Sequence, residues 1–102
     1  MNKDKIYTID EIRTIINDNK DYFEERFFVD KFFLFGSYAK NLQNADSDID
    51  LLVKFKKTVD MFDFIDLQDY LSRLFEKKID LGTSNGLKDF IKEKILKEAI
   101  LL

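Results

Sequence analysis

The sequence predicts one α/β or α+β domain over residues 1–102. Three observations favour this class. Segments with helical periodicity alternate with short apolar segments typical of strands, which indicates a sheet covered by helices. The length of 102 residues is that of one domain with one core. Apolar residues make up 45% of the chain, an ordinary share for a globular protein.

The helices are expected from capping residues and periodicity. Thr8 and Glu11 form a Thr-x-x-Glu capping box, with isoleucines at helical spacing behind it. We expect helices over residues 9–19, 61–75 and 87–101, an added turn over 21–26 and a short turn over 37–40. The helix over 61–75 has a broad apolar stripe made of Phe64, Ile65, Leu67, Leu71, Leu74 and Phe75. Ser84 and Asn85 are N-cap candidates for the last helix, whose stripe is Leu87, Phe90, Ile91, Ile95 and Ile100.

Three strands are expected, over residues 27–35, 48–55 and 78–81. The first is apolar on both parities towards its end, so we expect it to be central in the sheet and covered on both faces. In the second, Asp48, Asp50 and Leu52 share one face, and the residues between them share the other. Gly82 is expected to end the third strand.

The composition excludes several kinds of chemistry. The chain has no Cys, which excludes a disulfide framework and a thiolate metal site. It has no His, which excludes a His-based triad, a His general base and a His-rich zinc site. Acid–base chemistry must therefore fall to carboxylates, Lys or Tyr. The net charge of −3 argues against stable, nonspecific binding of nucleic acid.

The location expected from the sequence is the cytoplasm. No apolar h-region follows the first residues, so no signal peptide is evident. No apolar run approaches the roughly 20 residues of a membrane span, so we expect no membrane association.

A short turn of Gly36 and Ser37 precedes two aspartates, Asp48 and Asp50, on one strand. A Gly-Ser turn offers backbone N–H groups and a hydroxyl to a phosphate. Residues at i and i+2 of a strand point to the same face, with Cα atoms roughly 6.6–6.8 Å apart. Both carboxylates can therefore converge on Mg²⁺, which takes oxygen ligands. A phosphate cradle beside a divalent-metal site is what nucleotidyl transfer requires.

The two aspartates also have a simpler interpretation. An Asp-x-Asp pair alone is more commonly two surface residues on an edge strand. Here the pair lies among apolar residues, where a charged pair costs desolvation unless something compensates it, and a metal ion would do so. Asp80 is the candidate third carboxylate, because Ile79 and Leu81 have the opposite, core-facing parity. The alternative for Asp80 is a solvent-facing strand residue.

The candidate nucleotide-binding residues are Gly36, Ser37, Lys40 and Ser47. Gly36 allows a close approach of the backbone to a ligand, and Ser37 can donate its hydroxyl and N–H to phosphates, or simply cap a helix. Lys40 either neutralises a triphosphate as a point charge or is a solvated surface residue. Ser47 caps or braces the start of the strand that carries the aspartates.

These motifs resemble the signature of the minimal nucleotidyltransferases of the DNA polymerase β-like superfamily. The family pattern is Gly-Ser-x-Ala-Arg-Gly, a variable loop, and Ser-Asp-(Ile/Val)-Asp-Leu. Here Lys40 stands where Arg is usual, and Asn41, which tolerates the left-handed conformation, where Gly is usual. The resemblance covers nearly the whole chain. It implies a nucleotidyltransferase fold, a small mixed central β-sheet packed by about four helices.

The resemblance also implies an activity and a partner. Asp48, Asp50 and Asp80 would be catalytic and would hold two Mg²⁺ ions, with Asp80 able to accept the proton of the attacking hydroxyl. ATP would be the substrate. Small prokaryotic members pair with a HEPN toxin, and transfer AMP from ATP to a tyrosine of that toxin. The expected function is therefore an Mg-dependent protein adenylyltransferase that acts as the antitoxin in a hetero-oligomer with its toxin.

Two alternatives stay open. The first is a catalytically weak or inactive antitoxin that neutralises its partner by binding, which the departures at Lys40 and Asn41 make worth keeping. The second is a nucleotidyltransferase that acts on a small molecule or RNA, although the acidic balance counts against RNA.

Overall fold

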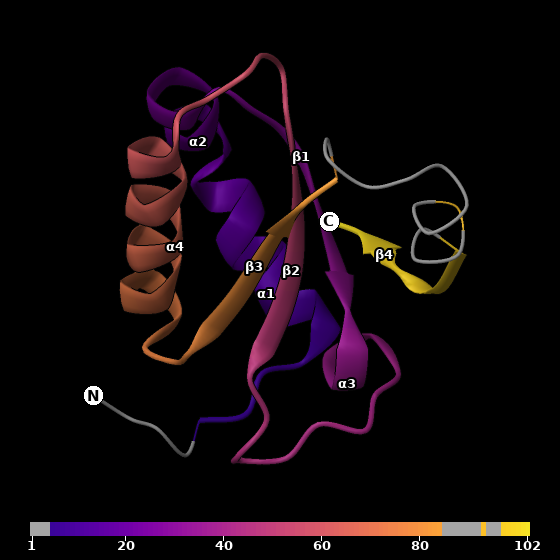
Figure 1. The fold of residues 1–102 in the computed structure, drawn as a ribbon. Coiled ribbons are helices and arrows are strands. Elements are labelled where there is room, and N and C mark those ends of the chain that lie inside the picture. Colours follow the sequence, from indigo (N-terminus) through magenta and orange to yellow (C-terminus); the bar gives the residue numbers. More distant parts are fainter. Residues whose placement is uncertain (1–4, 85–92, 94–96) are drawn as a thin grey trace.

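The computed structural model of the chain describes residues 5–84, 93 and 97–102. This described part contains four helices and four strands (Figure 1), in the order α1 (Ile9–Asp18), α2 (Lys20–Phe27), β1 (Val29–Phe35), α3 (Gly36–Ala39), β2 (Ile49–Phe55), α4 (Met61–Phe75), β3 (Ile79–Thr83) and β4 (Ile100–Leu101). The four strands form one sheet in the order β3-β2-β1-β4. β1 is antiparallel to β2 and β4, whereas β2 and β3 are parallel. The predicted mixed α/β architecture is therefore confirmed.

One face of the sheet packs on α1, α2 and α4 and forms the core. The side chains that fill it come from both layers and are completely or almost completely buried: Ile12, Phe23, Leu34, Ile49, Leu51, Val53, Leu67, Leu71, Phe75 and Ile79. Side chains alternate between the faces of a strand, so Asp50 and Asp80 lie on the opposite face. This arrangement puts Ile49, Leu51, Val53 and Ile79 in the core and leaves the carboxylates outside it.

The ends of the helices follow the predicted capping chemistry. Thr8 Oγ1 accepts a hydrogen bond from Glu11 N, and Glu11 Oε1 accepts one from Thr8 N, so the capping box is confirmed. Asp60 caps α4 by accepting a 2.8 Å hydrogen bond from Asp63 N.

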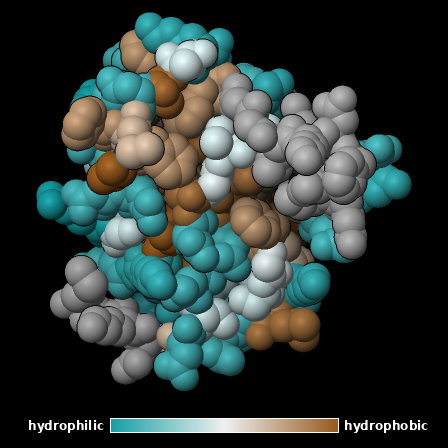
Figure 2. All heavy atoms as spheres, viewed as in Figure 1, coloured by the Kyte–Doolittle hydropathy of each residue, from teal (hydrophilic) through white to brown (hydrophobic). Residues whose placement is uncertain are grey.

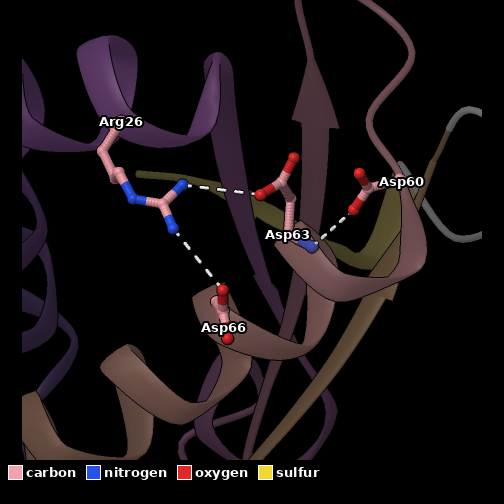
Figure 3. Close-up of polar contacts among 4 residues, drawn as sticks. All are labelled: Arg26, Asp60, Asp63 and Asp66. Carbon is pink, nitrogen blue, oxygen red and sulfur yellow. Dashed lines mark hydrogen bonds and ion pairs between the residues drawn. The ribbon is translucent and has the colours of Figure 1, made fainter.

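Figure 3 shows that Arg26 of α2 reaches α4, where its two terminal nitrogens lie 3.5 and 3.4 Å from Asp63 and Asp66. These exposed ion pairs contribute little energy each, but they tie α2 to the first turns of α4.

A buried hydrogen bond connects the N-terminal segment to the end of α4. The hydroxyl of Tyr7 donates to the carbonyl of Phe75 at 2.6 Å, and Tyr7 is 2% exposed. We expect Tyr7→Phe to cost about 1–2 kcal/mol, because the buried carbonyl loses its donor. Thermal unfolding should then occur several degrees lower. Tyr22→Phe, at a residue that is 45% exposed, is the control and should change little; equal effects of the two variants would contradict this reading.

The strands differ from the prediction at several ends. β1 begins at Val29, because Phe27 ends α2 and Phe28 takes the left-handed conformation, with φ of 58°. β1 is central, as predicted, but its Phe33 and Phe35 are only half-buried. Gly82 does not end β3: it pairs with Leu52 of β2, and the strand runs on to Thr83.

The helix predictions are correct for α4, whose bounds are the predicted ones, and wrong in three details. Residues 20–27 form a separate helix, α2, rather than one added turn. Ile65 is 52% exposed and does not belong to the buried stripe of α4. Ile100 and Leu101 are not helical but form β4, which pairs with Leu34 and Phe33 of β1. The rest of the predicted last helix lies mostly outside the described residues.

The side chain of Ile65 is part of an exposed apolar patch. Met61 and Phe62, in the first turn of α4, are 74% and 79% exposed. Apolar side chains gather over the first turns of α4, whereas hydrophilic ones cover the opposite end of the molecule, where β2 and β3 begin (Figure 2). In the part of the chain that the structure describes, no helix has the length and apolarity needed to cross a membrane.

Candidate active site

The end of β1 brings Gly36 against the carboxylate of Asp50. Phe35, the last residue of β1, pairs with Asp50 of β2, so the next residue lies beside the aspartate side chain. Gly36 has φ of +72°, a left-handed conformation that other residues rarely adopt. A Cβ at this position would lie 3.0 Å from Cγ of Asp50 and closer still to its Oδ2. Only glycine therefore fits this close approach of the backbone to a carboxylate.

Asp50 and Asp80 are neighbours across the parallel strands β2 and β3. The two residues pair in register, so their side chains leave the same face of the sheet. The pKa of Asp50 is raised, first by burial, then by the negative charges of Asp80 and Asp48 and by a hydrogen bond with Asp80. The fold thus holds like charges together on a half-buried surface, which is an arrangement typical of functional sites.

Asp48 lies one residue before β2, which begins at Ile49 rather than at the predicted Asp48. Its carboxylate forms an ion pair with Lys78 at 3.6 Å, with the two side chains 39% and 74% exposed. Among the described residues, no group of three or more acidic, His or Cys side chains is spaced to hold a metal ion. The structure therefore brings Asp50 and Asp80 together and leaves Asp48 at their edge, paired with a lysine.

The predicted nucleotide-binding residues lie around α3 and the loop that follows it. Ser37 is half-buried in the single turn of α3, and the exposed Lys40 ends that turn by donating its N–H to the carbonyl of Gly36. Asn41 has φ of 58°, the left-handed conformation that Asn tolerates better than most residues. Ser47 Oγ accepts a 3.0 Å hydrogen bond from Asn44 N, which makes it a brace of the loop before β2.

Tyr38, between these residues, points into the core. Its side chain is 0% exposed, and burial is the main cause of its raised pKa. The hydroxyl therefore stays neutral at ordinary pH, and Tyr38 is a packing residue rather than a base for the reaction.

Two lysines beside the site were missed by the sequence reasoning, which gave them no role. Lys78 pairs with Asp48. Lys77 is buried, with 6% exposure, and its Nζ donates a 2.9 Å hydrogen bond to the carbonyl of Ala45. The sequence carries one signal for this burial, because Lys77 has the same parity as Ile79 and Leu81, the core-facing residues of β3.

The chemistry of the donor set suits a hard divalent cation. Asp50 and Asp80 supply carboxylate oxygens from adjacent strands, and Asp48 can join them if it leaves Lys78. Burial and then the negative charges of Asp80 and Asp48 raise the pKa of Asp50, and a bound cation would offset both of these costs of the charged form. The residues present therefore fit Mg²⁺, and the Gly36 turn lies directly beside the Asp50 carboxylate.

The fold and these residues define the chain as a nucleotidyltransferase. Residues 12–102 match the family described as "Nucleotidyltransferase domain", and the chain belongs to this family. The resemblance to the minimal nucleotidyltransferases is confirmed by its relatives. A solved structure assigned to that group superimposes with a TM-score of 0.78, at 28% identity, over 94% of this chain and 97% of that one.

Curated relatives have names that specify a reaction. The chain is 42% identical over 94 residues to MJ0128 of Methanocaldococcus jannaschii, to which protein adenylyltransferase activity is ascribed; the match covers 91% of this chain and 96% of the relative. It is 36% identical over 93 residues to the protein adenylyltransferase MntA of Thermococcus cleftensis, covering 91% and 94% of the two chains.

The same fold occurs in a solved complex. The structure of a tri-AMPylated Shewanella oneidensis HEPN toxin with an MNT antitoxin matches with a TM-score of 0.58 at 20% identity, over 90% of this chain and 66% of the matched one. This likeness concerns the fold.

Proposed function

We propose that this nucleotidyltransferase moves AMP from ATP to a tyrosine hydroxyl of a HEPN-family partner, and so acts as the antitoxin of a toxin–antitoxin pair. The observation that carries the proposal is the contact of Gly36 with the carboxylate of Asp50, with Asp80 in register on the next strand. The Gly36 turn can hold the phosphates of ATP, and the two carboxylates can act at the reacting phosphorus. The turn and the Asp50 carboxylate are in contact with each other. The names of the relatives support the reaction, and the AMPylated HEPN complex with a related fold supports the partner.

The transfer is a displacement at the α-phosphorus of ATP. The acceptor oxygen forms a bond to this phosphorus, the bond from the phosphorus to the bridging oxygen breaks, and pyrophosphate leaves with the electron pair. The Gly36 turn and Ser37 would position the phosphates through backbone N–H groups and the hydroxyl. Asp80, the more exposed of the paired carboxylates, would accept the proton of the hydroxyl. Positioning and charge stabilisation account for most of the catalysis in such transfers.

Asp48, Asp50 and Asp80 are the residues that would hold Mg²⁺. Bound Mg²⁺ would neutralise phosphate charge and lower the pKa of the attacking hydroxyl. This chain would supply the oxygen ligands. To act as one of them, Asp48 must break its ion pair with Lys78. Lys40, exposed at the end of α3, can add a positive point charge near the phosphates.

The test is transfer of label from ATP carrying ³²P in its α-phosphate. The purified chain is incubated with this ATP, Mg²⁺ and a HEPN-family protein encoded beside it. We expect label on the partner, loss of labelling with EDTA, and loss when the acceptor tyrosine of the partner is changed to Phe. The chain with Asp48→Asn is the matched control and should leave the partner unlabelled.

Other outcomes have defined meanings. Tight binding to the partner without label would refute the proposed reaction and favour an antitoxin that acts by contact. Label on RNA or on a small molecule, and none on the partner, would refute the protein acceptor.

A further inference from the structure

The loop that precedes β2, the strand of Asp50, is held by a hydrogen bond from a buried lysine. Lys77, in the turn between α4 and β3, reaches 32 positions back along the sequence, and its ammonium donates to the carbonyl of Ala45. Three residues later the same loop delivers Asp48. In Figure 1 the loop before β2 and the turn before β3 lie together at the lower end of the molecule.

The other hydrogen bonds of this loop are mostly local. Asn44 N and the side chain of Ser47 bond to each other, Asp46 N bonds to the side chain of Asn44, and Ser47 N bonds to the carbonyl of Asn44. Such bonds give the loop a shape but do not fix it to the sheet. Two other parts of the chain dock it. Gln43 Nε2 donates a 3.1 Å hydrogen bond to the carbonyl of Tyr7 on one side. On the side of residues 44–48 the neighbouring turn does so: Lys77 holds Ala45, and the carbonyl of Lys78 accepts from Ile49 N at 3.1 Å.

The burial of the lysine is an energetic cost. An ammonium that loses part of its hydration shell loses solvation free energy, which its hydrogen bonds must offset. An apolar side chain of similar length would fill this place at least as stably. The ammonium of Lys77 is therefore better explained by the loop that it positions than by a contribution to the stability of the fold.

We propose that Lys77 is a positioning residue for Asp48. Its ammonium fixes the loop over residues 44–48 and so keeps the Asp48 carboxylate at the edge of the Asp50–Asp80 pair, from where it can join them in binding a divalent cation once it leaves Lys78. This inference rests on the proposed function for its metal, but the placement of the loop is a property of the metal-free chain.

The first test compares Lys77→Met with the wild-type chain. Met keeps the apolar length and removes the ammonium. We expect the thermal midpoint to stay within a few degrees of wild type or to rise. The affinity for Mn²⁺, measured from the free-ion EPR signal, should fall about 10–100-fold, as for other residues that orient a ligand. Amide hydrogen exchange in the metal-free chain should become faster over residues 44–48. Lys56→Met, at the other end of β2, is the control and should change neither quantity, since Lys56 forms an exposed ion pair with Glu24.

The second test is a chemical rescue that the composition makes possible. The chain has no cysteine, so Lys77→Cys introduces one unique thiol. In denaturant, its thiolate displaces bromide from 2-bromoethylamine and gains an aminoethyl group, which restores an ammonium at nearly the length of lysine. Bromoethane gives the neutral ethyl product. After refolding, we expect the aminoethyl protein to regain Mn²⁺ affinity and slow exchange, and the ethyl protein to lack both.

The inference is overturned if Lys77→Met leaves both Mn²⁺ affinity and loop exchange unchanged, or if the two alkylated proteins behave alike. It is also overturned if affinity falls only in proportion to the folded fraction. A wild-type chain that binds no Mn²⁺ would instead refute the proposed metal-dependent function, because loop exchange reports the placement by Lys77 independently.

Discussion

Replacement of Asp50 by Asn is expected to reduce AMP transfer at least about a hundredfold, the scale on which removal of one charge-stabilising group acts, and to make the metal-free chain more stable. The carboxylate stands half-buried beside Asp80, in contact with the Gly36 turn, where it would bind the cation that the proposed reaction requires. In the absence of a cation the same carboxylate is repelled by its neighbours. Asn keeps the shape, removes that charge and can donate a hydrogen bond to Asp80. Activity and stability should thus change in opposite directions.

The pH dependence follows from the raised pKa of Asp50. A carboxyl whose pKa is higher in the folded than in the unfolded state binds its proton more tightly when folded. Its contribution to stability therefore falls as the pH rises from the unfolded pKa, about 3.9, through the folded one. The stability advantage of Asp50→Asn should be full at neutral pH and should shrink as the pH falls through this range. Urea unfolding of both proteins in EDTA, from pH 7 to pH 4, measures the difference.

Asp30→Asn is the matched control, because Asp30 is an exposed carboxylate on β1 whose ion pair with Lys54 is 3.9 Å long. It should keep full transfer and show little change in stability. If Asp50→Asn transferred AMP at the wild-type rate, Asp50 would not belong to the reacting centre. If this variant were less stable than wild type at neutral pH, the repulsion argument would be wrong.

The sequence was sufficient where local chemistry determines the structure. The capping box at Thr8 places the start of α1, and the stripe of apolar residues in α4 gives its bounds to the residue. The motif residues were predictable for a similar reason. Strand parity alone puts Asp50 on the face opposite the core. Its place beside Gly36 depends in addition on the register of β1 with β2, in which Phe35 pairs with Asp50.

The sequence was insufficient where distant segments compete with a local pattern. Ile100 continues a helical stripe, yet it lies in β4, because pairing with Leu34 supplies backbone partners that no local signal reveals. Gly82 looks like the end of a strand, but β2 offers Leu52 as a partner and β3 runs on. Lys77 was given no role because its partner, the carbonyl of Ala45, lies in another loop. In each case the missing information is a long-range contact.

The Gly36→Ala substitution should give the second large effect, because it acts on both the backbone and the site. With φ of +72°, alanine would be strained at this position, at a cost of about 1–3 kcal/mol. Its Cβ would also meet the Asp50 carboxylate, with Cγ at 3.0 Å and Oδ2 closer. The carboxylate must then turn away from the phosphate side of the site. We expect a lower thermal midpoint together with a loss of transfer larger than the unfolded fraction explains.

Two comparisons separate the strain from the collision. Gly82→Ala is the control, since a Cβ there meets only Leu52 Cδ1, at an ordinary 3.4 Å, and its cost should be small. In an Asp50→Ala background the carboxylate is gone, so Gly36→Ala should cost the backbone strain and a tight 3.3 Å contact with the Cβ of residue 50. The difference between the two backgrounds then measures the collision with the carboxylate. Equal costs in both backgrounds would mean that glycine is required for its backbone alone. In that case the close approach of Gly36 to Asp50 would not explain why the site requires glycine.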